Sequence, residues 1–226
     1  MMSLDGLRSG LIVSVQAWPG SAIDDPQVIA AMAQAAAQNG AVGVRVAGVA
    51  HLRAVRARVQ TPIIGIIKRE YAGFAPYITP TLDDVAAIAD CGAEIVAFDA
   101  TRRRRPGDLS TDVLVAAIHR RGALAMADCA TFDDMRAARA DGADIVATTL
   151  CGYTDETKGQ SLPALALVRR AAELGTFVIC EGGVKAPAQV REALDAGADA
   201  VVVGTAITNV DWLVREFAVP TTKSPR

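Results

Sequence analysis

The sequence predicts an α/β fold, namely a single (β/α)8 (TIM) barrel domain that spans residues 1–226. A Gly-Ala phrase followed by an apolar run recurs four times, and its glycines (Gly40, Gly92, Gly142 and Gly197) lie roughly 50 residues apart. Two βα units need about 50 residues, so four repeats give eight strands. Strand-like and helix-like segments also alternate without a break in composition. An open doubly wound sheet is the alternative, but no G-x-G-x-x-G follows the first strand.

Apolar runs of strand length lie between the repeated phrases. These runs predict strands over residues 11–16, 63–68, 123–128 and 177–181, and the other four strands follow the repeat glycines. Their nearly continuous apolar character is typical of strands that are buried on both faces of a parallel sheet. Each repeat glycine follows an Ala-rich helical stretch, so we expect it to end that helix with a positive φ.

Helix start signals fall between these strands. Asp25 before Pro26 predicts an N-cap and the first residue of a helix that continues to about Asn39. The pairs Thr81/Asp84 and Thr131/Asp134 predict two further helix starts. The remaining helices are expected over residues 49–58, 110–121, 163–174, 187–196 and 211–217. From about Val219 the chain carries two prolines, which predicts a frayed tail.

The composition excludes several functional classes. The net charge of −2 provides no basic field for nucleic acid or for a membrane surface. No apolar run approaches the roughly 18 residues of a membrane span, and the first ten residues lack a secretory signal. The four cysteines stand singly, which indicates reduced thiols and a cytoplasmic protein. With only His51 and His119 as imidazoles, we predict no metal site.

Polar residues stand at the carboxyl end of every predicted strand. In a parallel barrel these ends meet on one face, where the chemistry of such folds takes place. The residues are Gln16, Arg45, Lys68, Asp99, Thr101, Asp128, Thr148, Thr149, Glu181 and Thr205. Burial alone requires none of them, so the pattern predicts a catalytic or binding site at this face. Individual members such as Asp99 and Thr148 have an alternative interpretation, in which they only hold loops.

Lys68 and Glu181 are the candidate catalytic pair. A partly desolvated lysine near another cation, such as Arg45, has a lowered pKa and can take up and return a proton. Glu181 either acts as a second acid–base group or holds the lysine in its reactive state. The alternative is a plain ion pair across the rim of the barrel.

Glycines after two neighbouring strands predict a phosphate site. Gly182 and Gly183 follow the seventh strand, and Gly204 and Thr205 follow the eighth. Backbone N–H groups in such loops can approach an anion, and these two loops commonly bind phosphate in barrels. A tight turn without a ligand is the alternative interpretation.

A four-arginine loop, residues 102–105, follows the fourth strand. Most of these arginines are expected to be solvated, and one or two could turn toward a phosphosugar.

Several phrases at the strand ends resemble one enzyme family. They lie at residues 13–17, 67–70, 77–81, 98–101, 103–106, 127–128, 148–150, 152–154, 181–182 and 203–204. Together they cover most of the chain, roughly residues 10–217, and resemble the N-acetylmannosamine-6-phosphate 2-epimerases of sialic acid catabolism. The resemblance implies interconversion of N-acetylmannosamine 6-phosphate and N-acetylglucosamine 6-phosphate at C2, without a cofactor or metal.

The resemblance also implies roles for individual residues. Lys68 and Glu181 match the catalytic lysine and glutamate, and the backbone after Glu181 and Gly204 matches the phosphate site. Residues expected to contact the sugar or its N-acetyl group are Gln16, Arg45, Asp128, Thr149, Tyr153 and Arg103.

The chain also departs from the family pattern at three positions. Asn209 stands where an arginine that looks like a phosphate ligand is usual, and Lys185 or a loop arginine is the expected replacement. Cys151 replaces a serine. Gly183 replaces a larger residue, which predicts a slightly more open loop.

The sequence leaves other functions open. Lys68 could form a Schiff base in an aldolase or lyase of phosphorylated sugars. A phosphosugar-binding regulatory barrel without catalysis is a further alternative. The state of assembly is not determined by the sequence, and a homodimer is one expectation.

Overall fold

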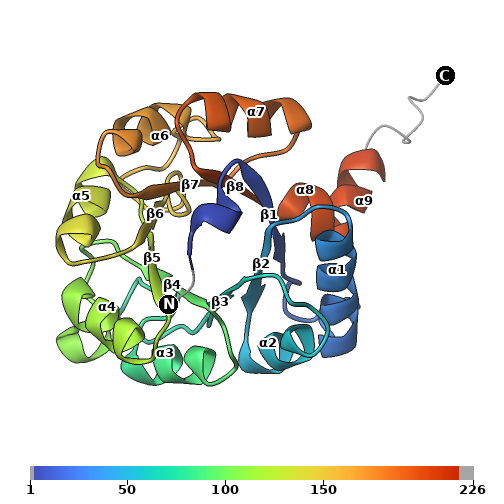
Figure 1. The fold of residues 1–226 in the computed structure, drawn as a ribbon, viewed down its shortest axis with the longest axis horizontal. Coiled ribbons are helices and arrows are strands. Elements are labelled where there is room, and N and C mark those ends of the chain that lie inside the picture. Colours follow the sequence, from blue (N-terminus) through green and yellow to red (C-terminus); the bar gives the residue numbers. More distant parts are fainter. Residues whose placement is uncertain (1–2, 219–226) are drawn as a thin grey trace.

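A computed structural model describes residues 3–218 of the chain. Within these residues, eight strands form a closed barrel in the order β1 to β8, surrounded by the helices (Figure 1). All pairings are parallel, and β8 pairs with β1 to close the barrel. The strands are β1 Gly10–Val15, β2 Gly43–Ala47, β3 Ile63–Ile66, β4 Ile95–Asp99, β5 Leu124–Asp128, β6 Ile145–Ala147, β7 Phe177–Glu181 and β8 Ala200–Val203. The predicted fold is confirmed.

The helices begin where the sequence signals predict. Asp25 caps α1 by accepting hydrogen bonds from two backbone N–H groups, while Thr81 and Thr131 cap α3 and α5. The helices are α1 Pro26–Gln38, α2 Val49–Arg56, α3 Leu82–Ala89, α4 Thr111–Arg120, α5 Phe132–Ala140, α6 Leu165–Ala172, α7 Pro187–Asp195, α8 Thr205–Thr208 and α9 Val210–Ala218. The short α8 was not predicted. The tail expected from Val219 lies outside the described residues.

The repeat glycines adopt the backbone conformation that their position predicts. Gly40, Gly92, Gly142 and Gly197 have φ values of 97°, 78°, 93° and 101°. A side chain at such positive φ is strained, which explains why each turn from helix to strand uses glycine.

The core has two layers because side chains alternate along each strand. One layer packs between the strands and the outer helices, and the other fills the barrel interior. On several strands, the last apolar residue that points into the barrel interior is followed, two positions later, by a polar residue that points the same way. Examples are Ile66 to Lys68, Met126 to Asp128 and Ile179 to Glu181. The alternation that buries the core therefore also directs these polar side chains over the barrel axis.

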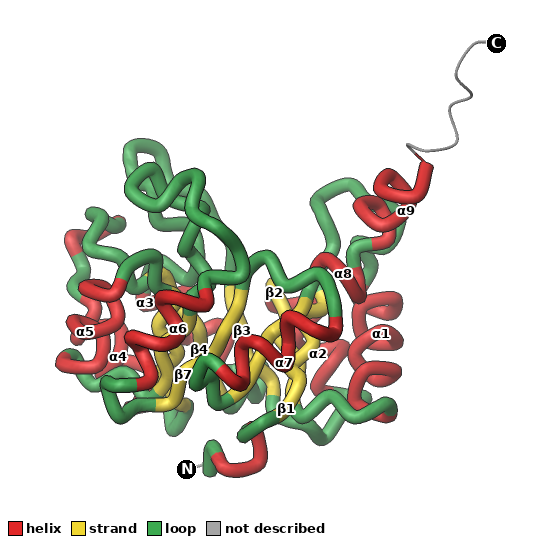
Figure 2. The backbone as a smooth tube through the Cα atoms, turned by 90° about the horizontal axis from the view of Figure 1, so that it is seen from above, coloured by secondary structure: helices red, strands yellow, loops and turns green. Residues whose placement is uncertain are grey.

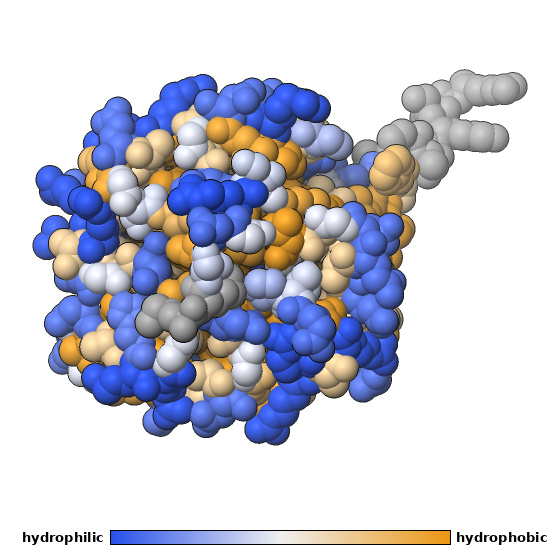
Figure 3. Space-filling view, in the orientation of Figure 1, coloured by the Kyte–Doolittle hydropathy of each residue, from blue (hydrophilic) through white to orange (hydrophobic). Residues whose placement is uncertain are grey.

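Figure 2 shows the two ends of the barrel from the side, with tall loops at one end and the N-terminal turn at the other. The same view shows α9 projecting from the barrel beyond α8. In Figure 3, hydrophilic side chains cover much of the outer surface. Among residues 3–218, no helix has both the length and the apolar composition needed to cross a bilayer.

Gly65 in β3 provides a test of how tightly the outer layer is packed. A Cβ atom there would lie 2.3 Å from a methyl carbon of Ile88 and 3.1 Å from the Cβ of Ala93. Overpacking of this kind costs about 1–3 kcal/mol, so Gly65→Ala should lower the free energy of unfolding by that amount in a urea titration. Gly6→Ala is the control, since no atom lies within 4 Å of its added Cβ. Equal stability of the two variants would contradict the described packing.

Candidate active site

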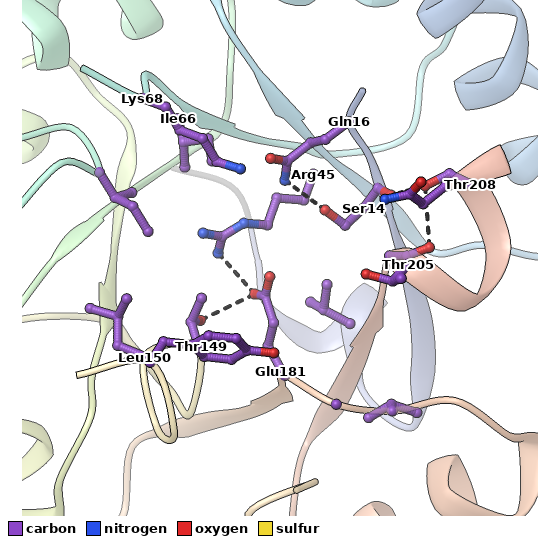
Figure 4. Close-up of a pocket in the computed structure, with 18 of the residues that line it drawn as sticks. Ser14, Gln16, Arg45, Ile66, Lys68, Thr149, Leu150, Glu181, Thr205 and Thr208 are labelled. Carbon is purple, nitrogen blue, oxygen red and sulfur yellow. Dashed lines mark hydrogen bonds and ion pairs between the residues drawn. The ribbon is translucent and has the colours of Figure 1, made fainter. Parts of the chain in front are cut away.

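A cavity of about 480 Å³ opens at the carboxyl ends of the strands. Ten of the residues predicted for the site line it: Gln16, Arg45, Lys68, Thr149, Tyr153, Glu181, Gly182, Gly183, Gly204 and Thr205. They come from segments that are far apart in the sequence and that the barrel closure brings together (Figure 4). The strand-end pattern therefore locates one shared cavity.

Arg45 is the charged centre beneath this cavity. Its side chain is 1% exposed and forms a bidentate ion pair with Asp128, with N–O distances of 2.7 and 3.0 Å. Its Nη1 also donates to Oε2 of Glu181 at 2.9 Å. Burial by itself lowers the pKa of Arg45, but the carboxylates of Asp128 and Glu181 outweigh it and raise the pKa above its ordinary value. Arg45 is therefore a permanent cation that holds both acids in place.

Glu181 titrates far from the range of an ordinary glutamate. Burial, together with the nearby charge of Asp128, raises its pKa from 4.5 to about 7. Arg45, the hydroxyl of Thr149 and Lys68 all oppose this shift. The Thr149 hydroxyl lies 2.6 Å from Oδ1 of Asp128 and 3.2 Å from Oε2 of Glu181. Near neutral pH, Glu181 can thus be either a proton donor or an acceptor.

Lys68 extends into the same cavity from the segment that follows β3 (Figure 4). The Lys68 side chain is exposed to the cavity, but the protein groups around the cavity limit its contact with water. This partial burial, and then the charge of Arg45, lower the pKa of Lys68, whereas Glu181 and Asp128 oppose the change. Lys68 forms no ion pair with any described carboxylate, because Arg45 engages the Glu181 carboxylate. A plain ion pair between Lys68 and Glu181 is therefore not the arrangement observed.

Thr79 holds the segment that carries Lys68. Its N–H donates to the carbonyl of Ile67 at 2.7 Å, and its hydroxyl accepts from the N–H of Ile67 at 3.2 Å. Thr79 is fully buried, with φ at 45°, although it is β-branched and precedes Pro80. Such a conformation is strained and persists only where the surroundings impose it. No local sequence signal indicates this contact.

The glycine loops after β7 and β8 line the cavity and carry unpaired backbone donors. The N–H groups of Gly182, Gly183 and Gly204 donate to no carbonyl or side chain within residues 3–218. The expectation that Gly183 opens its loop is wrong, because Leu162 fills the space. A Cβ atom on Gly183 would lie 2.3 Å from the Cβ of Leu162.

Two predicted site residues lie outside the cavity lining. Asp128 lies beneath Arg45, fully buried. Arg103 instead donates to Asp99 and to the Thr101 hydroxyl, at 2.7 and 2.9 Å. Arg105 also turns inward, but it binds backbone carbonyls of its own loop. A role for Arg103 in substrate binding therefore stays a prediction.

Two of the strand-end residues have structural partners, as the alternative interpretation allows. The Thr148 hydroxyl donates to the carbonyl of Glu181 at 2.8 Å and accepts from its N–H at 3.0 Å. Asp99 accepts from both the N–H and the hydroxyl of Thr101. Thr148 thus fixes the end of β7 on which Glu181 stands, while Asp99 organises the arginine loop.

The structure adds cavity residues that the sequence did not reveal. They are Ser14, Trp18, Tyr77 and Trp212. Lys185, which the sequence offers as a replacement for the missing arginine, lines the cavity as well. Ser14 has the same inward direction as its register partner Arg45, so strand alternation could have indicated it. The others lie on loops or on α9, where no periodicity applies. Asn209 also lines the cavity, and its side-chain oxygen accepts from the N–H of Trp212 at 2.9 Å at the start of α9.

A closed parallel barrel with a lysine and a glutamic acid at its mouth, both with shifted pKa values, is the arrangement of a barrel enzyme that moves protons. Residues 3–218 contain no cluster of three His, Cys, Asp or Glu side chains suited to a metal ion.

Comparison with known proteins identifies the family. Residues 29–223 match the family model NanE, described as "Putative N-acetylmannosamine-6-phosphate epimerase". A protein of Klebsiella pneumoniae subsp. pneumoniae named as such a 2-epimerase is 49% identical over 91% of this chain and 87% of its own length. A protein of Salmonella typhimurium named "Putative N-acetylmannosamine-6-phosphate 2-epimerase 1" is 46% identical over 93% of this chain and 92% of its own length. The chain belongs to the NanE family.

A solved structure shows the same fold with related sequence. The N-acetylmannosamine-6-phosphate 2-epimerase from Clostridium perfringens is 38% identical and superposes with a TM-score of 0.93. The match covers 96% of this chain and 95% of that one.

The raised pKa of Glu181 predicts a pH-dependent stability. Since its folded pKa of about 7 exceeds the ordinary 4.5, the folded state binds an extra proton between these values. The free energy of unfolding should therefore fall as the pH rises through this window, by up to about 1.4 kcal/mol per pH unit. Glu181→Gln should remove this contribution in urea titrations from pH 4 to 8, whereas exposed Glu156→Gln should follow the wild type. Parallel curves for wild type and Glu181→Gln would contradict the shift.

Proposed function

We propose that this protein is a cofactor-independent 2-epimerase that interconverts N-acetylmannosamine 6-phosphate and N-acetylglucosamine 6-phosphate. The observation that carries the proposal is the pair formed by Lys68 and Glu181, which share one cavity while their pKa values shift toward each other. Membership of the NanE family supports the substrate class. A lysine and a carboxyl group that titrate closer to neutral pH suit the removal and return of a carbon-bound proton.

The chemistry follows from the open-chain form of the sugar. Lys68, as a neutral amine, removes the proton from C2, and the C–H electron pair forms a C1=C2 double bond while the carbonyl pair moves onto the C1 oxygen. Cations and hydrogen-bond donors around the cavity stabilise this enolate. Reversal of the electron flow with proton return to the other face of C2 inverts that centre. Glu181, on the β7 side of the cavity, is the group placed to deliver or guide that proton (Figure 4).

The surrounding residues suit the rest of the substrate. The Nε2 of Gln16 donates to the Ser14 hydroxyl at 2.7 Å, and its buried Oε1 has no partner within residues 3–218. That free acceptor could take the N–H of an acetamido group. Tyr153 lies at the rim, where its side chain is 61% exposed and can cover a bound sugar. The unused N–H groups of Gly182, Gly183 and Gly204, next to Thr205, suit the phosphate group.

Lys68→Met tests the role of the lysine. Loss of a general base costs about 10²–10⁴ in rate, so kcat should fall by at least a hundredfold while substrate binding persists. Proton NMR in deuterated water, starting from N-acetylmannosamine 6-phosphate, follows epimer formation and deuterium entry at C2 together. Exposed Lys158→Met is the matched control and should keep wild-type turnover.

Two outcomes would contradict the epimerase. Trapping of substrate on Lys68 by borohydride, with cleavage products, would indicate a Schiff-base lyase. Tight binding of hexosamine phosphates without turnover would indicate a regulatory barrel.

We further propose a homodimer that forms through α9. One side of this helix carries exposed apolar residues, Val210 (46% exposed), Val214 (59%) and Phe217 (78%), spaced as one helical stripe. Contiguous apolar surface of this kind commonly marks an interface.

Val214→Asp should therefore shift the protein toward monomer in sedimentation equilibrium. Val113→Asp, at an exposed valine on α4, is the control and should leave the molecular mass of the assembly as in the wild type. A monomeric wild type would refute the dimer.

We also propose a cytoplasmic location. Cys91, Cys129, Cys151 and Cys180 are all unpaired and buried, as in proteins of reducing compartments.

A further inference from the structure

The cavity has few cations to meet the phosphate group that the proposed substrate carries. A phosphate monoester bears close to two negative charges at neutral pH, and backbone N–H groups alone do not neutralise them. Among the described residues, the cations that line the cavity are Arg45, Lys68 and Lys185. Which of these three cations binds the phosphate is a question that rests on the proposed function and extends it.

Arg45 and Lys68 have other tasks. Arg45 lies buried below the cavity, and its two terminal nitrogens are engaged by Asp128 and Glu181. Lys68 approaches from the β3 side, away from the glycine loops, and its ammonium is needed at the reacting carbon (Figure 4). Neither is available to a phosphate held at the loops after β7 and β8.

Lys185 lies where a cation could bind the phosphate. It lies two residues after Gly183, and its N–H donates to Oε1 of Gln189 at 2.7 Å. Its side chain forms no ion pair within residues 3–218, and its Nζ lies 5.6 Å from the ring centre of Trp212. Trp212 also lines the cavity, and it lies in the first turn of α9, which follows the short α8 after β8. Lys185 thus brings a charge without an ion-pair partner to the cavity wall beside the glycine turn after β7.

We propose that Lys185 binds the substrate phosphate, and that its ammonium leaves the face of Trp212 to do so. The long flexible stem of a lysine allows this movement, and charge-assisted hydrogen bonds to phosphate are stronger than an exposed cation–π contact. Asn209 contributes no charge at this end, since its side chain is neutral and its oxygen accepts from the N–H of Trp212. Lys185 is therefore the residue that makes the cavity specific for phosphorylated sugars.

Steady-state kinetics test the assignment. Lys185→Gln should raise KM for N-acetylmannosamine 6-phosphate by about tenfold to a hundredfold, the range of a lost charge-assisted hydrogen bond, with kcat nearly unchanged. Lys185→Arg should recover most of the loss, because it restores the charge. Lys158→Gln removes an exposed lysine outside the cavity and should leave both constants at wild-type values.

Trp212 provides a second readout that does not require turnover. In a Trp18→Phe background Trp212 is the remaining tryptophan, so emission reports on the ring beside Lys185. Addition of substrate or inorganic phosphate should change this emission when Lys185 is present, and should leave it unchanged in Lys185→Gln.

The outcomes separate the two proposals. Wild-type turnover with an unchanged KM in Lys185→Gln would overturn the role of Lys185 and leave the epimerase intact. Absence of wild-type turnover would refute the proposed function, and the phosphate titration of Trp212 emission would still decide the role of Lys185.

Discussion

The site depends on one buried cation. Removing a guanidinium from water is costly unless carboxylates surround it, and Arg45 is tolerated at 1% exposure only because Asp128 and Glu181 bind it. Asp128 forms the bidentate pair with Arg45, and Glu181 accepts one hydrogen bond from the same guanidinium. Burial, followed by the charge of Asp128, raises the pKa of Glu181 to about 7. The same positive charge lowers the pKa of Lys68. A single arginine thus lowers the pKa of both members of the acid–base pair, and at Glu181 burial outweighs this effect.

The barrel supplies this arrangement through the two-residue alternation of its strands. Arg45, Asp128 and Glu181 each occupy an inward position on β2, β5 and β7, and apolar side chains fill the interior one step below the two carboxylates. Closure of β8 onto β1 then places residues that are more than a hundred positions apart within hydrogen-bonding distance. The packing of the interior and the position of the site residues depend on the same strand register. A shift of one strand by one residue would therefore disrupt both.

Sequence reasoning could reach those features that depend on local periodicity. It located the strand-end residues, the capped helices and the positive-φ glycines, because alternation, caps and turns each have a local signature. It could not reach contacts made by loops. The strained Thr79, the contact of Leu162 with Gly183 and the position of Lys185 beside Trp212 depend on how separate loops meet in space. Whether Lys68 would pair with Glu181 was equally undecided, since that depends on Arg45 engaging the carboxylate first.

The contact between Leu162 and Gly183 constrains how this site can diverge. Any side chain at position 183 would occupy volume that Leu162 already fills, and the φ of 72° there adds a further penalty. Neither position can therefore change size alone without loss of fit. In evolutionary terms the two residues form a compensated pair, so a lineage that enlarges one must first shrink the other or reroute the backbone between β6 and α6.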